Sequence, residues 1–101
     1  MIDTKAMREE IDAIRGYLIS EFSPQAIEHE FIDHDRDLYC FRVRLAPYGC
    51  LIRVTDGFLM TTRGPAVTEF LRRHRFVWKI QASSADKALL VTSRGIVEEP
   101  V

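Results

Sequence analysis

Two short clusters in the first half of the chain have the side chains that bind divalent metals. Segments 28–30 and 33–35 read Glu-His-Glu and Asp-His-Asp, and carboxylates and imidazoles are common metal ligands. On a strand, however, successive side chains point to opposite faces, so His29 and Asp33 would lie on one face and three other ligands on the opposite one. We therefore expect no metal site, and we interpret His29 as a core histidine.

Cysteine and serine chemistry offers no stronger candidate. The two cysteines, Cys40 and Cys50, have no adjacent histidine in the sequence, and a nucleophilic thiol needs an activating neighbour. The strand register inferred below places them on opposite faces, which argues against a disulfide. The sequence also has no serine elbow, phosphate-binding loop or dinucleotide fingerprint. We expect a protein that has no cofactor and is not an enzyme.

An arginine-rich segment is the main candidate for binding an anionic partner. Arg72, Arg73 and Arg75 lie close together after Arg63, and aromatic residues follow them, as in many nucleic-acid-binding surfaces. Cations in the last turn of a helix also complement the helix dipole, and Glu69 lies one turn before them. We interpret the cluster as a helix end, and nucleic-acid binding through these four arginines as the alternative.

Charge is segregated along the chain. The first forty residues hold ten acidic and four basic side chains, whereas residues 41–97 hold ten basic and three acidic ones. Either the two parts neutralise each other in the fold, or the basic part is kept for an anionic partner. This choice decides between a protein-binding and a nucleic-acid-binding domain.

Length and composition limit the architecture. With 101 residues, 47% of them hydrophobic, the chain suits a single domain, which we place at residues 1–97, followed by a flexible tail at residues 98–101. No apolar run approaches the length of a membrane span, and the sequence opens with charged, helix-forming residues instead of a signal peptide. We expect a cytoplasmic protein that does not bind membranes.

Apolar spacing predicts two helices. The first extends from Asp3 or Thr4 to about Glu21, and Ser23-Pro24 ends it because the residue before a proline is pushed out of the helical region. The second opens at Gly64-Pro65, with proline at the first helical position. The buried faces are expected to consist of Met7, Ile11, Ile14 and Leu18 in the first helix, and of Val67, Phe70, Leu71 and His74 in the second.

Alternation of apolar and polar residues predicts five strands. The ranges are 27–33, 39–45 and 50–55 before the second helix, and 76–81 and 88–93 after it. The first three form a meander and the last two a hairpin. Residues 58–62 are expected to form a short extended segment after the turn signal Asp56-Gly57.

Requiring one apolar face throughout the meander predicts its register. Pairing Leu45 with Cys50 and Phe31 with Phe41 satisfies this rule, and a shift of two residues would keep the faces while changing the partners. The face turned away from the core would carry Ile32, Cys40, Arg42, Arg44, Leu51 and Arg53.

This outer face mixes apolar residues with arginine, a composition typical of protein interfaces. Glu28 and Glu30 of the first strand would lie beside Arg44 and Arg42 and cancel much of their charge. The face is therefore expected to bind protein rather than phosphate. A charge introduced at Leu51 is expected to separate the subunits of a dimer formed there.

The order helix, three strands, helix, two strands predicts an α+β domain in which two helices pack on one face of an antiparallel sheet. This order is similar to that of type III secretion chaperones, small proteins that pair as dimers and hold an extended effector segment. The resemblance covers the order of elements only, and the final helix of that family has no counterpart in this sequence. We transfer no residue roles from it.

We expect a protein-binding domain, homodimeric and adaptor- or chaperone-like, whose partner is another protein. Its binding residues are expected to be Ile32, Arg42, Arg44, Leu51 and Arg53.

Overall fold

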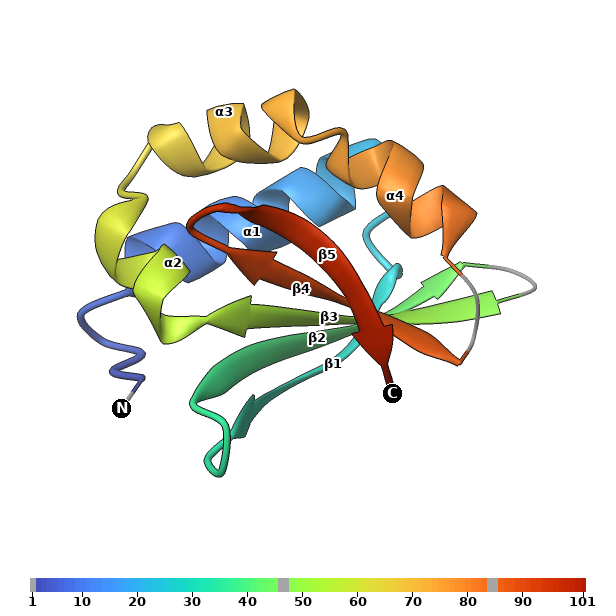
Figure 1. Ribbon diagram of the computed structural model, residues 1–101. Helices are drawn as coiled ribbons and strands as arrows, with labels where there is room; N and C mark the ends of the chain where they lie inside the picture. Colours follow the sequence, from blue (N-terminus) through green and yellow to red (C-terminus); the bar gives the residue numbers. More distant parts are fainter. Residues whose placement is uncertain (1, 46–47, 84–85) are drawn as a thin grey trace.

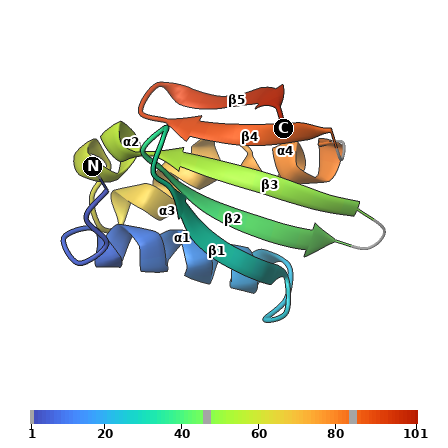
Figure 2. The same ribbon diagram turned by 90° about the horizontal axis from the view of Figure 1, so that it is seen from below.

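Helices cover one face of a five-stranded sheet and leave the other face open (Figure 1). The computed structural model describes residues 2–45, 48–83 and 86–101. Seen from below, the strands run in the order β1-β2-β3-β4-β5 with the helices behind them (Figure 2). The elements are α1 (Arg8–Glu21), β1 (Ile27–Asp33), β2 (Leu38–Leu45), β3 (Tyr48–Thr55), α2 (Asp56–Thr61), α3 (Ala66–Arg73), α4 (Phe76–Ala82), β4 (Lys87–Thr92) and β5 (Gly95–Pro100).

The first helix matches the expected apolar stripe but starts later. The carboxylate of Asp3 accepts hydrogen bonds from the N–H groups of Lys5 and Ala6 and holds the chain in turns before α1 begins at Arg8. Such local bonds offer the backbone an alternative to the helix. The face of α1 turned to the sheet buries Ile11, Ile14 and Leu18, so this part of the prediction is confirmed.

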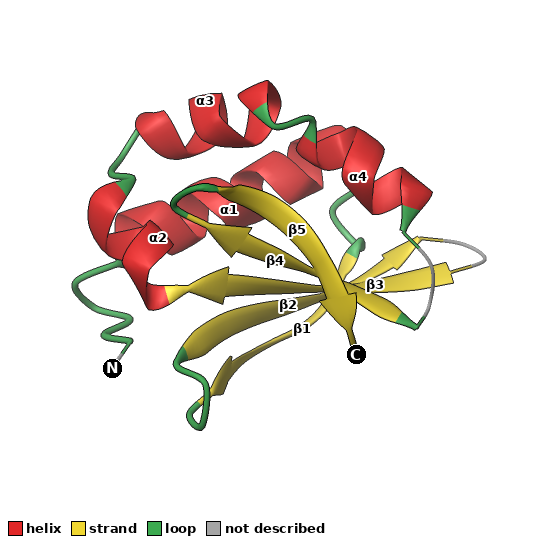
Figure 3. Ribbon diagram, in the orientation of Figure 1, coloured by secondary structure: helices red, strands yellow, loops and turns green. Residues whose placement is uncertain are grey.

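The helices α2, α3 and α4 lie where the sequence predicted a single helix, and they are among the red segments of Figure 3. The segment expected to be extended at residues 58–62 falls largely in α2, whose start is capped because the Thr55 side chain accepts a hydrogen bond from the Phe58 N–H at 3.1 Å. The strand expected at residues 76–81 is helix α4 instead. Phe76 and Ile80 are four residues apart, so a helix buries both of them and turns Trp78 to solvent.

The β2–β3 hairpin keeps the predicted faces but shifts its register by two residues. Val43 lies opposite Cys50, and Arg42 opposite Leu51. Because side chains alternate with a period of two, this shift leaves each side chain on its expected face. The predicted partner of Cys50, Leu45, pairs with Tyr48 instead.

A β-bulge between Ile27 and His29 changes the register of β1 by one residue. Phe31 therefore lies opposite Cys40 rather than opposite Phe41, and it packs on the open side of the sheet. Ile32, predicted on the outer face, packs against the main core on the helix side. One extra residue in a strand moves every following side chain to the other face, and that is the physical reason for both corrections.

The sheet is only partly antiparallel. Strands β3 and β4 are parallel, and α2, α3 and α4 form the connection that a parallel pair requires. The last hairpin consists of β4 and β5, one element later than predicted. Residues 98–101, expected as a flexible tail, belong to β5 as far as Pro100, where Glu99 pairs with Ala88.

The main core lies between the sheet and the helices. Its largest fully buried side chains include Phe41, Phe58 and Phe76, which come from β2, α2 and α4. The rings of Phe58 and Phe70 meet edge-on at a centroid distance of 4.9 Å, which ties α2 to α3.

Candidate functional site

A second apolar cluster lies on the open face of the sheet. None of the described helices or strands covers this face (Figure 2), yet Leu51 is only 7% exposed and Ala88 is fully buried. We call this group the outer cluster; it consists of Phe31, Leu38, Cys40, Leu51, Ala88 and Leu90.

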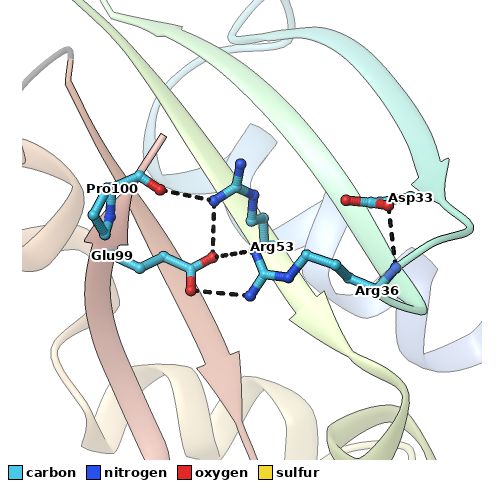
Figure 4. A network of polar contacts seen from close by, with 5 residues as sticks. All are labelled: Asp33, Arg36, Arg53, Glu99 and Pro100. Atoms are coloured by element: carbon cyan, nitrogen blue, oxygen red, sulfur yellow. Dashed lines mark hydrogen bonds and ion pairs between the residues drawn. The ribbon is translucent and has the colours of Figure 1, made fainter.

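A network of charged side chains lies beside the outer cluster on the same face (Figure 4). Glu99 of β5 accepts hydrogen bonds from Arg53 of β3 at 2.8 Å and from Arg36 of the β1–β2 turn at 3.0 Å and 3.1 Å. Arg53 also donates to the carbonyl of Pro100, and the carboxylate of Asp33 accepts a bond from the Arg36 N–H. The two guanidinium groups hold the pKa of Glu99 below its ordinary value. The network thus ties β5 to the β1–β2 turn across three strands.

The surface left accessible on this face is aromatic and basic. The rings of His29 and Phe31 stack at a centroid distance of 5.4 Å. Arg44 forms an ion pair with Glu28, as the sequence predicted. Arg42 is exposed and forms no ion pair among the described residues. His29 is exposed, so its interpretation as a core histidine is wrong.

Of the five predicted binding residues, two remain on the accessible surface, namely Arg42 and Arg44. Leu51 is buried in the outer cluster, and the Arg53 side chain is only 14% exposed because it pairs with Glu99. Ile32 lies on the helix side. Sequence reasoning missed Phe31, Leu90 and Glu99, because the bulge and the last strand were not recognised.

The two ends of the open face differ in charge. Arg42 lies toward the end of β2 at Leu45, beside Arg44, which is paired with Glu28, whereas Asp33 at the end of β1 and Asp35 in the β1–β2 turn lie near the start of β2. Arg36 of the same turn is already paired with Glu99. The face therefore has a basic end and an acidic end.

Glu30 has a different partner from the one expected. Its carboxylate faces the helix side, where it accepts two hydrogen bonds of 2.7 Å from the Arg15 guanidinium and one of 2.7 Å from the Tyr39 hydroxyl. These contacts lower the pKa of Glu30, and burial beside that carboxylate raises the pKa of Tyr39 to about 12. The expected pair between Glu30 and Arg42 is therefore absent, since the bulge has moved Glu30 to the other face.

The arginine cluster of the alternative function is divided. Arg72 and Arg73 lie in the last turn of α3, as the helix-end interpretation predicts. Arg73 pairs with Glu69 at 2.8 Å, and Arg63 lies 3.3 Å from the buried carboxylate of Glu10. Within the described ranges, Arg72 and Arg75 form no ion pair.

Metal and thiol chemistry find no support in the parts of the chain that the structure describes. No group of three or more His, Cys, Asp or Glu side chains among those residues could hold a metal ion. Cys40 belongs to the outer cluster and Cys50 to the main core, so they lie on opposite faces as predicted. Burial raises the pKa of both thiols, which disfavours the reactive thiolate.

No helix in the described ranges is long and apolar enough to cross a membrane. Comparison with family models, with curated proteins and with solved structures finds no match to this chain.

Proposed function

We propose that this chain is a protein-binding domain that forms a homodimer through the open face of its sheet. The observation that carries the proposal is an apolar cluster in the middle of a sheet face that none of the described helices covers. Phe31 and Leu90 of this cluster remain half-buried, and Val97, which pairs with Leu90, is 52% exposed. Two sheets that pack face to face would remove these side chains from water.

The charges of the face favour a second copy in one orientation. A two-fold axis that runs across the strands, in the plane between the two sheets, reverses the strand direction of the partner. The basic end with Arg42 would then lie against the acidic turn with Asp35 of the other subunit, and the reverse contact would form at the opposite end. An axis along the strands would bring like charges together, which is unfavourable.

This orientation predicts the outcome of a charge exchange. Arg42→Glu and Asp35→Arg should each weaken the dimer at least about tenfold, because each places like charges in contact twice in a symmetric interface. The double variant Arg42→Glu with Asp35→Arg should recover most of the parent affinity. Sedimentation equilibrium of the four proteins measures this directly, and both positions are exposed, so the fold should be retained.

Met60→Glu is the matched control for this exchange. Met60 is 57% exposed on α2, away from the open face, so its charge should leave the dimer unchanged. A parent protein that is monomeric at tens of micromolar, about the range of interfaces near 7 kcal/mol, would contradict the homodimer. A dimer that neither single variant weakens would place the interface elsewhere.

Nucleic-acid binding remains the second candidate because one observation favours it. Trp78 is 63% exposed on α4, which follows the arginines of α3, and an exposed aromatic ring beside cations can stack on an unpaired base. Only Arg72 and Arg75 of the expected cluster lack an ion pair within the described chain. Two cations give few phosphate contacts, so we expect this binding to be weak.

Trp78 is the only tryptophan in the sequence, so its fluorescence reports on this surface. A single-stranded oligonucleotide should leave the emission unchanged at physiological salt. At low salt, quenching can be used to measure the affinity for the oligonucleotide. The slope of log affinity against log salt concentration should be no steeper than about −1.5, the value for two phosphate contacts on a single strand. Quenching that persists at high salt, and that Arg72→Gln with Arg75→Gln abolishes while Arg94→Gln does not, would favour the nucleic-acid function.

A further inference from the structure

A hollow of about 410 Å³ lies on the helix side of the molecule, between α1 and the segment that precedes it on one side and β2 on the other. Pockets of about 300–1,000 Å³ are typical of small-molecule sites. The hollow is lined by Thr4, Lys5, Arg8, Ile11, Asp12, Arg15 and Tyr39.

The wall of the hollow is held in place by a fixed polar network. Arg15 is bound at 2.7 Å by both carboxylate oxygens of Glu30, and Tyr39 donates to the same carboxylate at 2.7 Å. Arg15 also pairs with Asp12. These contacts join α1 to β1 and β2, so the wall is preorganised before any ligand arrives.

Two cations of the lining remain available to a ligand. Lys5 and Arg8 are exposed and form no ion pair among the described residues. Arg15, in contrast, is neutralised by Glu30 and Asp12. The hollow therefore offers two free positive charges beside the apolar side chain of Ile11 and the ring of Tyr39.

We propose that this hollow binds a small phosphorylated molecule, with its phosphate at Lys5 and Arg8 and its apolar part against Ile11 and Tyr39. Arginine matches the geometry of a phosphate group, and lysine supplies a compact second charge. The site lies on the opposite side of the sheet from the open face, so it does not depend on the proposed dimer.

Isothermal titration with AMP, adenosine and inorganic phosphate tests this site. AMP should bind with a Kd below about 1 mM, inorganic phosphate should bind more weakly than AMP, and adenosine should not bind. Lys5→Gln and Arg8→Gln should each weaken AMP binding at least about fivefold, the effect of one surface charge contact of about 1 kcal/mol. Neither side chain has a polar partner in the described structure, so melting temperatures should stay unchanged.

Two further variants test the same site. Asp12→Asn removes the one carboxylate of the lining and frees Arg15 from one of its partners, so AMP binding should become tighter. Arg72→Gln, at the end of α3, is a matched control that should have no effect. The proposal is overturned by AMP that does not bind at several millimolar, by adenosine that binds as well as AMP, or by Lys5 and Arg8 variants that bind like the parent.

Discussion

Replacing Leu51 by glutamate should lower the free energy of unfolding by about 3 kcal/mol or more, a large part of the stability of a domain of this size. Leu51 is 7% exposed and lies between Arg42 on β2 and Ala88 on β4. The substitution removes the apolar contacts of the side chain and places a carboxylate among the apolar residues of the outer cluster, where charge is costly.

The sequence alone predicts the opposite outcome for this variant, a folded monomer, because it places Leu51 at a subunit interface. Urea denaturation of the parent and of Leu51→Glu distinguishes the two expectations. Met60→Glu is the control, since Met60 is 57% exposed on α2, away from the open face, and it should change stability by less than about 0.5 kcal/mol. A Leu51→Glu protein as stable as the parent would show that the outer cluster does not stabilise the domain.

Removal of the buried carboxylate of Glu10 should have the second largest effect, about 2–4 kcal/mol of unfolding free energy for Glu10→Ala. The Glu10 side chain is 1% exposed in α1. Its Oε2 atom accepts a hydrogen bond of 2.9 Å from the N–H of Gly64 and lies 3.3 Å from Arg63. These contacts attach the α2–α3 connection to α1, and alanine would leave the Gly64 N–H without this acceptor, remove the ion pair of Arg63 and open a cavity.

Glu10→Gln separates the hydrogen bond from the charge. The amide oxygen of glutamine can still accept the bond from Gly64, while the desolvated negative charge, one oxygen of which has no hydrogen-bond partner in the described structure, is gone. We therefore expect Glu10→Gln to stay within about 1 kcal/mol of the parent. Thermal melts of the parent, Glu10→Ala and Glu10→Gln rank the stabilities of the three proteins. A glutamine variant as unstable as the alanine variant would show that the ion pair with Arg63 provides the stabilisation.

The sequence shows how charge is distributed along the chain, but it predicts only some of the ion pairs. Two ion pairs join the acidic first part of the chain to the basic remainder, namely Glu10 with Arg63 and Glu28 with Arg44. Glu99, near the end of the chain, pairs with both Arg36 and Arg53. Such pairs join residues far apart in sequence, and their partners depend on a strand order that composition does not contain.

The sequence by itself determined the buried face of α1, the presence of the β2–β3 hairpin and the faces of its side chains, the position of α3, and the opposite faces of Cys40 and Cys50. The period of the apolar residues fixes which face is buried, but it left the register of the hairpin open by two residues and did not fix the start of α1. Only the tertiary structure decided the rest. Phe76 and Ile80 fit the period of a strand and of a helix equally well, and packing on the sheet beside α1, where the rings of Phe76 and Tyr17 stack, selects the helix. The bulge at the start of β1 is a single extra residue that leaves the apolar pattern readable in two registers. It sends Phe31 to the open face and Ile32 to the core, because in a sheet a shift of one residue exchanges the two faces.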